Sequence, residues 1–275
     1  MPASLEEGWV RATALIQNEA GELGTGFFVA RKVDEASLRL FLITNKHVLA
    51  DTRKHRDGAR QIELNLNLRK DGKIVGTKAI LPLRLADGNA IWREHEDPDV
   101  DVLAIDVTAV KVQVVDMDVK WAGYDGFADP QKIVDHEITM ADEVIALGYP
   151  LGLKQGDTFL PIAKSGILAS KIGERVSDTV QTSGGELHHR NMPAFLVDGA
   201  FIPGSSGSPV ILKPMVGRVV RRNIVLSPAP SLLLGIISET KYVPVSTLHG
   251  ERLALPGIAL AFDVSTIIDV IESFF

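Results

Sequence analysis

A loop near residue 200 combines a serine with residues that can build a tight turn around it. The stretch Phe201-Ile-Pro-Gly-Ser-Ser-Gly-Ser-Pro209 places Gly204, Ser206 and Gly207 between two prolines, directly before the apolar run 210–212. Glycine permits backbone angles that are closed to other residues, and proline restricts the flanks. Such a loop can present backbone N–H groups beside a hydroxyl, which attack on a carbonyl and stabilisation of the resulting oxyanion both require. By itself the pattern is more typical of an ordinary turn.

His47 is the histidine whose surroundings best suit a base for that serine. A serine hydroxyl is a poor nucleophile at neutral pH and needs a neighbouring group to take its proton. His47 follows the mainly apolar run 40–46 and precedes the apolar run 48–50. We expect a strand that ends in a single helical turn, capped by Asn45. This arrangement would hold the imidazole rigidly at the mouth of a barrel, where a general base is useful.

The base needs a carboxylate on its other ring nitrogen, and four aspartates crowd one segment. These are Asp97, Asp99, Asp101 and Asp106. Asp101 opens the apolar run 102–105, so it can stand at the start of a strand with its charge partly desolvated. We expect the other three to be ordinary loop or surface carboxylates.

The elements that must position these residues are mostly strands. Short apolar or alternating runs separated by turn residues dominate the chain, and residues 61–68 alternate with period two, which is typical of a sheet with one wet face. Asp263 or Ser265 can cap a final helix whose apolar side faces the core. Many short strands with one terminal helix predict β-barrels rather than βαβ units.

Three blocks of the sequence occur in the order His, Asp, Ser: Thr44-Asn-Lys-His47, Asp101-Val-Leu-Ala-Ile105 and Gly204-Ser-Ser-Gly-Ser-Pro209. They resemble the signature blocks of the chymotrypsin-like (trypsin-like) serine peptidases. The likeness is closer to the bacterial Deg/Htr-type peptidase domain, without a PDZ domain. Four framework blocks also resemble that group: Gly24-Thr-Gly-Phe-Phe28, Glu143-Val-Ile-Ala-Leu-Gly-Tyr-Pro-Leu-Gly152, Lys164-Ser-Gly-Ile-Leu168 and Leu232-Leu-Leu-Gly-Ile-Ile-Ser238.

The resemblance implies an all-β fold of two six-stranded antiparallel β-barrels, a chymotrypsin-like double barrel, with a C-terminal α-helix. We place the N-terminal barrel, with the His and Asp, at 1–120 and an inter-barrel crossover at 121–142. The C-terminal barrel, with the Ser and the terminal helix, then occupies 143–275.

The resemblance also implies a role for each residue of the site. Ser206 would attack the peptide carbonyl, His47 would carry the proton, and Asp101 would orient His47 and stabilise its charged form. The backbone N–H groups of Gly204 and Ser206 would form the oxyanion hole. No cofactor and no metal site is expected; the adjacent His188 and His189 point apart in a strand and have no cysteine or carboxylate cluster beside them.

The substrate pocket is assigned by position within the same resemblance. Ala200 falls at the floor of the S1 pocket, and Ser238 at the wall, where it would also support the aspartate. Glu239 and Thr240 follow Ser238 and are expected at the rim. An uncharged, small floor provides no partner for a buried cation, so we expect a small to medium apolar P1 residue.

Two serines of the loop depart from the family pattern. Ser205 stands where trypsin-like digestive enzymes carry an aspartate that pairs with a freshly cut N-terminus, so we expect no activation by N-terminal cleavage. Ser208 replaces a glycine and adds a Cβ to the loop, and we expect this small residue to be tolerated.

Two alternatives to a serine endopeptidase stay open at this point. One is a catalytically silent or partner-activated trypsin-like module that acts in binding or signalling. The other is an esterase or other acyl transferase that uses the same triad, although the loop is not the Gly-x-Ser-x-Gly elbow of an α/β hydrolase. The partners expected are a protein or peptide substrate and, as an open question, a regulatory protein.

The composition sets outer limits on function. The 275 residues have a formal net charge of −6, so no global positive field favours nucleic acid or an anionic membrane. The chain has no cysteine, which excludes disulfides and a thiol nucleophile. No signal peptide and no apolar run of membrane-spanning length is visible. We therefore expect a cytoplasmic protein, or an exported one if a leader has been removed.

Overall fold

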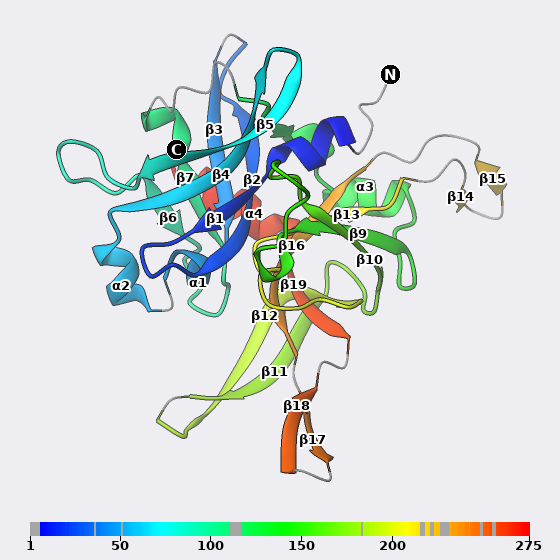
Figure 1. The fold of residues 1–275 in the computed structure, drawn as a ribbon. Helices are drawn as coiled ribbons and strands as arrows, with labels where there is room; N and C mark the ends of the chain where they lie inside the picture. The colour runs from blue at the N-terminus through cyan, green and yellow to red at the C-terminus, as the bar shows by residue number, and fades with distance from the viewer. Residues whose placement is uncertain are drawn as a thin grey trace.

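The protein consists of two β-barrels with one helix packed between them (Figure 1). The computed structural model describes residues 6–35, 37–50, 52–110, 117–182, 184–214, 218–220, 223–225, 231–241, 243–247, 250–254 and 257–275. The all-β double barrel and the C-terminal helix predicted from the sequence are both confirmed.

The first sheet contains eight strands in the order β5-β4-β1-β2-β3-β7-β6, with β8 beside β2. Its strands are β1 (Thr13–Gln17), β2 (Leu23–Lys32), β3 (Leu38–Thr44), β4 (Gln61–Lys70), β5 (Lys73–Pro82), β6 (Trp92–Glu94), β7 (Leu103–Asp106) and β8 (Ala122–Gly123). The edge strands β5 and β6 are connected at one end of the sheet. There the residue after β5, Leu83, accepts a hydrogen bond at 3.0 Å from the backbone N–H of Ile91, the residue before β6. The sheet has more than the six strands expected for this barrel because it also contains the very short strands β6 and β8.

The second sheet contains seven strands in the order β10-β9-β13-β16-β19-β12-β11. They are β9 (Glu143–Gly148), β10 (Ile162–Leu168), β11 (Arg175–Gln181), β12 (Leu187–Asp198), β13 (Pro209–Leu212), β16 (Leu233–Thr240) and β19 (Ile258–Asp263). Because β10 also pairs with β12, the strands β10-β9-β13-β16-β19-β12 close into a ring of six. The long β12 continues beyond the ring and pairs with β11, so these two strands project as a ribbon (Figure 1).

Two further hairpins stand apart from both barrels (Figure 1). One is formed by β14 (Arg218–Val220) and β15 (Asn223–Val225), the other by β17 (Val243–Thr247) and β18 (Gly250–Ala254). His249 and the arginines at 221 and 222 lie outside the described residues.

The helical segments are short except for the last one. They are η1 (Glu6–Val10), α1 (Lys46–Leu49), α2 (Arg53–Gly58), η2 (Val107–Val110), η3 (Tyr124–Gly126), α3 (Pro130–Asp135), η4 (Pro150–Gly152) and α4 (Val264–Glu272). Of the two caps predicted for α4, Asp263 is the one observed, because its side chain accepts a hydrogen bond from Ser265 N. None of the helices in the described part of the chain has the length and apolar character needed to cross a membrane.

Three large apolar clusters of the described residues hold the molecule together. One fills the first barrel, around Leu42, Leu64 and Ile105, and one fills the second barrel, around Phe195 and Val210. The third lies between the barrels and is sealed by α4; it includes Phe27, Phe41, Leu233, Phe262 and Ile267. Burial of this shared cluster fixes one barrel against the other, which any site that draws on both barrels requires.

The boundaries proposed for the two barrels and the crossover stay a prediction. The proposed crossover contains η3, α3 and the short β8, and β8 pairs in parallel with β2 of the first sheet.

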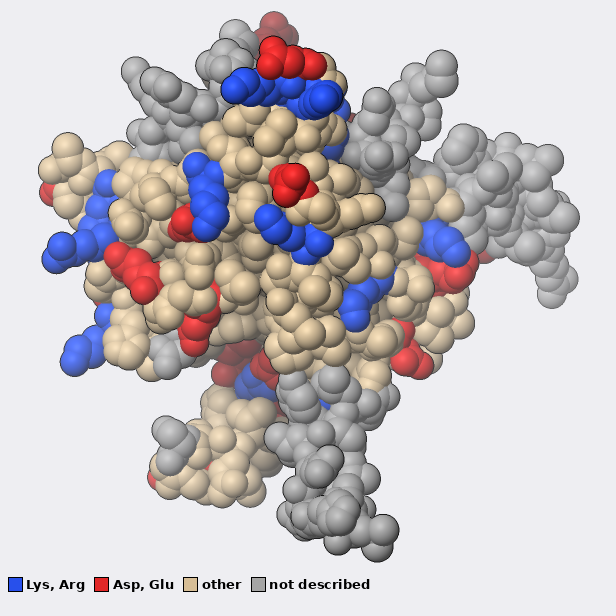
Figure 2. All heavy atoms as spheres, viewed as in Figure 1, with Lys and Arg blue, Asp and Glu red and all other residues tan. Residues whose placement is uncertain are grey.

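On the face drawn in Figure 2, Lys and Arg side chains are interspersed with Asp and Glu side chains.

Candidate functional site

His47 and Asp101 face each other at the mouth of the first barrel. His47 Nδ1 lies 2.6 Å from Asp101 Oδ2, and His47 N donates to Asp101 Oδ1 at 3.2 Å. Asn45 stands at the N-cap position of α1, but its side chain makes no capping bond, contrary to the prediction. Its Nδ2 donates to Asp101 O at 2.6 Å instead. The Asp101 segment is therefore attached to α1 at three points, which fixes the ring of His47.

The environment of His47 favours its protonated form. Burial lowers the pKa of the imidazole, but the hydrogen bond to Asp101 and the negative charges of Asp101, Glu239 and Glu22 outweigh it and leave the pKa above the ordinary value of 6.5. The side chain is still 43% exposed, so a reacting group can approach its free edge. A histidine with a raised pKa that is held by a carboxylate has the properties of a proton acceptor in acyl transfer.

Ser206 is connected to the same pair through Ser238. Ser206 Oγ donates to Ser238 O at 3.0 Å, and Ser238 Oγ donates to Asp101 Oδ2 at 2.7 Å. Ser206, Ser238, Asp101 and His47 thus form one continuous chain of contacts between the barrels. Among the described residues no hydrogen bond joins Ser206 directly to His47, so the serine hydroxyl is turned toward β16 in this state.

The loop before β13 has the left-handed backbone that its glycines allow. Gly204 has φ +90° and Gly207 has φ +85°, and a Cβ on Gly204 would lie 2.5 Å from Tyr149 O. The N–H groups of Gly204 and Ser206 donate to no acceptor within the described part of the chain. Two unengaged backbone donors beside a hydroxyl are what an oxyanion hole needs.

Thr25 of β2 belongs to the candidate site, although its residue type and pattern did not indicate this. Thr25 N donates to Ser206 O at 2.9 Å, and Thr25 Oγ1 donates to Gly204 O at 3.0 Å. The same hydroxyl accepts from Tyr149 N at 3.1 Å, and Thr25 O accepts from Thr44 Oγ1 at 2.7 Å. One fully buried threonine of the first barrel therefore holds the serine loop of the second barrel. The feature of the sequence that could have indicated this contact is the position of Thr25 between Gly24 and Gly26, since glycines allow another backbone to approach closely.

The chain matches one known family over most of its length. The model of the trypsin-like peptidase domain matches residues 24–220. The chain belongs to the trypsin-like peptidase family. Members of this family are hydrolases of the protease class. The matched residues include the loop around Ser206 and the segments of His47 and Asp101. None of the curated proteins matches the chain.

The structure of Deg5 agrees with the double-barrel fold of this trypsin-like chain, and two other solved structures are similar to it. The structure of Deg5 is 14% identical, with a TM-score of 0.51 over 98% of this chain and 91% of Deg5. The inactive form of the Rv3671c protease is 14% identical, with a TM-score of 0.47 over 99% of this chain and 96% of that one. The thermostable serine protease AL20 from an extremophilic microorganism is 13% identical, with a TM-score of 0.45 over 96% and 97%.

Ser208 stands where the trypsin-like pattern has glycine, and its side chain fits into a space beside Gly148. Ser208 is 1% exposed, and the Cβ of a larger residue at Gly148 would meet its Oγ and lie 3.3 Å from its Cβ. Glycine at 148 thus leaves the space that Ser208 occupies. Ser205 is also buried, and its Oγ is 3.5 Å from Ile202 N.

The residues assigned to the substrate pocket differ in what they contact. Ala200 is exposed, and its carbonyl accepts a hydrogen bond from Lys164 Nζ. Thr240 is half-buried at the end of β16. Ser238 contacts Ser206 and Asp101 as described, whereas Glu239 is engaged in ion pairs on the ribbon side of β16.

Those ion pairs form a network between the ribbon and β16. Arg190 of β12 donates to Asp178 at 2.6 Å and to Glu239 at 2.5 Å. Lys241 Nζ lies 2.7 Å from Asp178 Oδ2 and 2.9 Å from Glu239 Oε2. Hydrogen bonds from Arg190 and Lys241 lower the pKa of Asp178 to about 2 despite partial burial. Glu239, the residue after Ser238, is therefore held in place from the ribbon.

The adjacent histidines of β12 point to different partners, as predicted. His188 Nε2 lies 2.7 Å from Asp99 Oδ1, whereas His189 Nδ1 lies 2.7 Å from Thr179 Oγ1. Within the residues that the structure describes, no group of three or more His, Asp or Glu side chains gathers in a way that could hold a metal ion.

Proposed function

We propose that this trypsin-like protein is a serine endopeptidase whose nucleophile is Ser206. The observation that carries the proposal is the contact chain from Ser206 through Ser238 to Asp101 and His47, with its 2.6 Å pairing of imidazole and carboxylate. Membership of a family of peptidases supports the reaction class.

The chemistry begins with a rotation of one side chain. Ser206 Oγ leaves Ser238 O and turns to His47 Nε2, which takes its proton as the oxygen attacks the peptide carbonyl. The negative charge that develops on the carbonyl oxygen is met by the N–H groups of Gly204 and Ser206. His47 then gives the proton to the leaving amine, and water attacks the acyl-enzyme by the same route in reverse.

Asp101 acts through His47 and not on the substrate. Its Oδ2 accepts from Nδ1, which leaves Nε2 as the basic nitrogen, and its charge stabilises the imidazolium that forms. Ser238 Oγ and Asn45 Nδ2 hold Asp101 at the carboxylate and at the backbone.

We propose that the S1 pocket, with Ala200 at its floor and Glu239 and Thr240 toward its rim, takes a small or medium apolar P1 residue. The contact between Lys164 Nζ and Ala200 O supports rejection of Lys and Arg, because a second cation would be repelled near this floor. A peptide library varied at P1 tests this: cleavage after Ala, Val or Leu is expected. Preferred cleavage after Lys or Arg would contradict the assignment. Preferred cleavage after Asp or Glu would also contradict it and would indicate that Lys164 binds the P1 side chain.

We also propose that no N-terminal cleavage activates the protein. The support is Ser205, which is buried in the loop and offers no carboxylate to a new N-terminus. Activity of the intact chain equal to that of N-terminally trimmed protein is expected. Activity that appears only after trimming would contradict this.

The experiment that tests the function is hydrolysis of a fluorogenic peptide by wild type and by Ser206→Ala. Turnover by the wild type that is lost in the variant supports the endopeptidase, and a Ser205→Ala variant serves as the matched control because it removes the neighbouring hydroxyl. Equal hydrolysis by wild type and Ser206→Ala would contradict the assignment of the nucleophile. No turnover by any of them would favour a silent or partner-activated module.

A further inference from the structure

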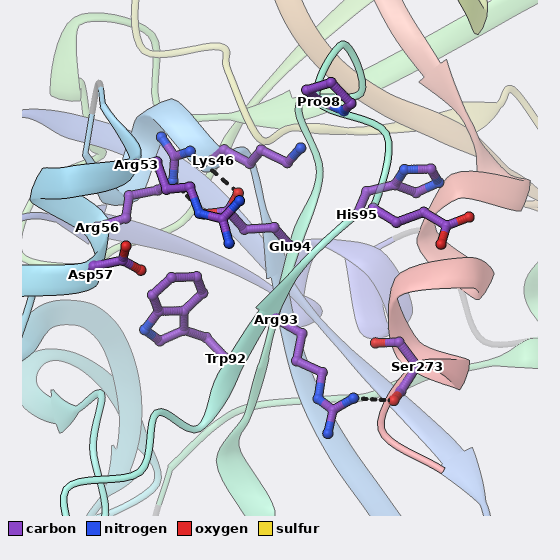
Figure 3. Close-up of a pocket in the computed structure, with 11 residues that line it drawn as sticks. Lys46, Arg53, Arg56, Asp57, Trp92, Arg93, Glu94, His95, Pro98 and Ser273 are labelled. Carbon is purple, nitrogen blue, oxygen red and sulfur yellow. Dashed lines mark hydrogen bonds and ion pairs between the residues drawn. The ribbon is translucent and has the colours of Figure 1, made fainter.

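A cavity of about 570 Å³ lies between α1, α2, β6, the segment 95–98 and the end of α4 (Figure 3). One residue of its wall is Lys46, the immediate neighbour of His47 in the sequence. Nothing in the proposed peptidase mechanism uses this cavity.

Lys46 brings a positive charge into the cavity wall without a matching carboxylate. The residue is 6% exposed, and its Nζ donates to a backbone carbonyl, Asp97 O, at 3.0 Å. No carboxylate of the described residues forms an ion pair with it. Burial, together with the positive charge of Arg56, lowers the pKa of Lys46 more than the negative charges of Glu94, Asp101 and Asp97 raise it. A buried ammonium with one neutral acceptor leaves two N–H donors and a charge to be satisfied.

The other buried groups of the wall are donors as well. Arg56 is 7% exposed and is neutralised by Glu94, with Nε at 2.7 Å from Oε1. Trp92 is 9% exposed, and its buried Nε1 has no hydrogen-bond partner in the part of the chain that is described. Arg53 lines the cavity from the exposed side of α2, and its guanidinium bonds to no described residue. Figure 3 shows Lys46, Arg53 and Arg56 gathered on one side of the cavity.

The acidic residues do not cancel this surplus inside the cavity. Asp57 and Glu96 line it and are exposed, as Arg53 is, so water solvates these charges, while Glu94 is already paired. Arg93 is engaged with Ser273 O. What is buried and unsatisfied is therefore cationic or a hydrogen-bond donor, and Trp92 supplies an apolar surface beside it.

We propose that this cavity binds a small organic anion. Its carboxylate or phosphate group lies between Lys46 and Arg53, and its apolar body packs toward Trp92. Charge-assisted hydrogen bonds to ammonium and guanidinium groups are the strongest that a protein can offer to such a group. The volume admits a ligand of the size of phenyl phosphate or benzoate.

Occupancy has a direct route to the triad, a step that rests on the proposed function. The carbonyl that Lys46 binds, Asp97 O, also accepts from Val100 N at 3.1 Å and so holds the turn that leads into Asp101. An anion that draws Lys46 Nζ away from Asp97 O releases one of the two donors on this turn. Lys46 also directly precedes His47 in α1, and Asp101 follows Pro98 of the cavity wall on the same turn.

The test is calorimetric titration of the full chain with phenyl phosphate and benzoate at constant ionic strength. Inorganic phosphate serves as the anion without an apolar body, and phenol as the body without a charge. We expect saturable 1:1 binding of at least one aromatic anion, and the two probes distinguish a phosphate site from a carboxylate site. Arg53→Gln should weaken binding about tenfold, the effect of one charge-assisted hydrogen bond.

The matched control is Lys54→Gln, which removes the same charge from the next residue of α2 but does not line the cavity. It should bind like the wild type. No saturable binding by the wild type, or equal weakening in both variants, would overturn the proposal. Quenching of tryptophan fluorescence that persists in Trp92→Phe would also place the ligand elsewhere, since the chain has two other tryptophans.

The link to the triad has its own readout. The rate at which a fluorophosphonate labels Ser206 should change when the anion is bound in the wild type and stay constant in Arg53→Gln. Binding without any change of that rate would overturn the link but not the site. Binding itself needs no activity, so failure of the peptidase proposal and failure of the anion site are distinguishable.

Discussion

Thr25 Oγ1 donates to Gly204 O at 3.0 Å, across 179 positions of the sequence and from one barrel to the other. Thr25 N donates a second hydrogen bond to the same loop, to Ser206 O at 2.9 Å. The backbone of the serine loop is therefore fixed on a strand of the first barrel, the barrel that also carries His47 and Asp101. Relative placement of nucleophile and base depends on this one buried threonine as well as on the shared apolar cluster.

Thr25→Val should leave the fold intact but loosen the loop. The isosteric change removes the hydroxyl from Gly204 O and Tyr149 N, which leaves both without that partner, and about 1–3 kcal/mol of unfolding free energy should be lost. Misplaced oxyanion donors should lower kcat/KM by about 10²-fold. Urea unfolding and peptide hydrolysis measure the two effects. Thr25→Ser keeps the hydroxyl and should retain most of the activity; equal loss in both variants would contradict the role of the hydroxyl.

Ser238→Ala tests the support of Asp101. The change removes the 2.7 Å hydrogen bond to Asp101 Oδ2 but keeps the carbonyl that Ser206 contacts. Because Ser238 Oγ acts through Asp101 and not on the substrate, kcat should fall about tenfold while KM stays near the wild-type value. Ser238→Thr, which keeps a hydroxyl, should restore part of kcat. A change confined to KM would instead place Ser238 in substrate binding.

The pH dependence of activity should follow His47. The base works in its neutral form, and its pKa is raised above 6.5, so the acidic limb of kcat/KM should lie above pH 6.5. Glu239 favours the imidazolium through its charge, so Glu239→Gln should lower the pKa and move the limb to lower pH. Glu174→Gln removes an exposed charge that pairs with Lys171 and should leave the limb in place. A limb that stays fixed or moves upward in Glu239→Gln would contradict the electrostatic assignment.

Arg190→Gln should destabilise the protein in a pH-dependent way. The folded-state pKa of Asp178 is about 2, below its ordinary 3.8, so the ionised form contributes stability above pH 3.8 that is lost as the pH falls through about 2. At pH 7 the variant should lose about 1–3 kcal/mol of unfolding free energy. The difference from wild type should shrink toward pH 2. Urea unfolding measures it, with Lys171→Gln as the control for an exposed pair that contributes little. A difference that is constant from pH 7 to pH 2 would exclude the carboxylate as its source.

The sequence was enough to predict what local chemistry and pattern determine. The apolar run before His47, the start of a strand after Asp101 and the glycines around Ser206 each predicted their own segment, and their order along the chain indicated the family. The cap of α4 at Asp263 was also predictable, because it depends on residues two positions apart.

What could not be predicted depends on contacts between distant segments. Asn45 had the right residue type for a helix cap, but its amide binds Asp101 O, 56 positions away. Thr25 is an ordinary strand residue by propensity, and only the packing of the barrels places it under Gly204. The space at Gly148 that admits Ser208 and the network that engages Glu239 arise in the same way. Each requires the tertiary fold before it can be recognised.

The measurement that tests the central claim most directly is labelling of the intact protein with a fluorophosphonate, followed by mass spectrometry of the modified peptide. A working nucleophile activated by His47 and Asp101 should place the phosphonyl group on Ser206, and Ser206→Ala and His47→Ala should both abolish labelling. Labelling of Ser205 or Ser208, or labelling that persists in His47→Ala, would contradict the account.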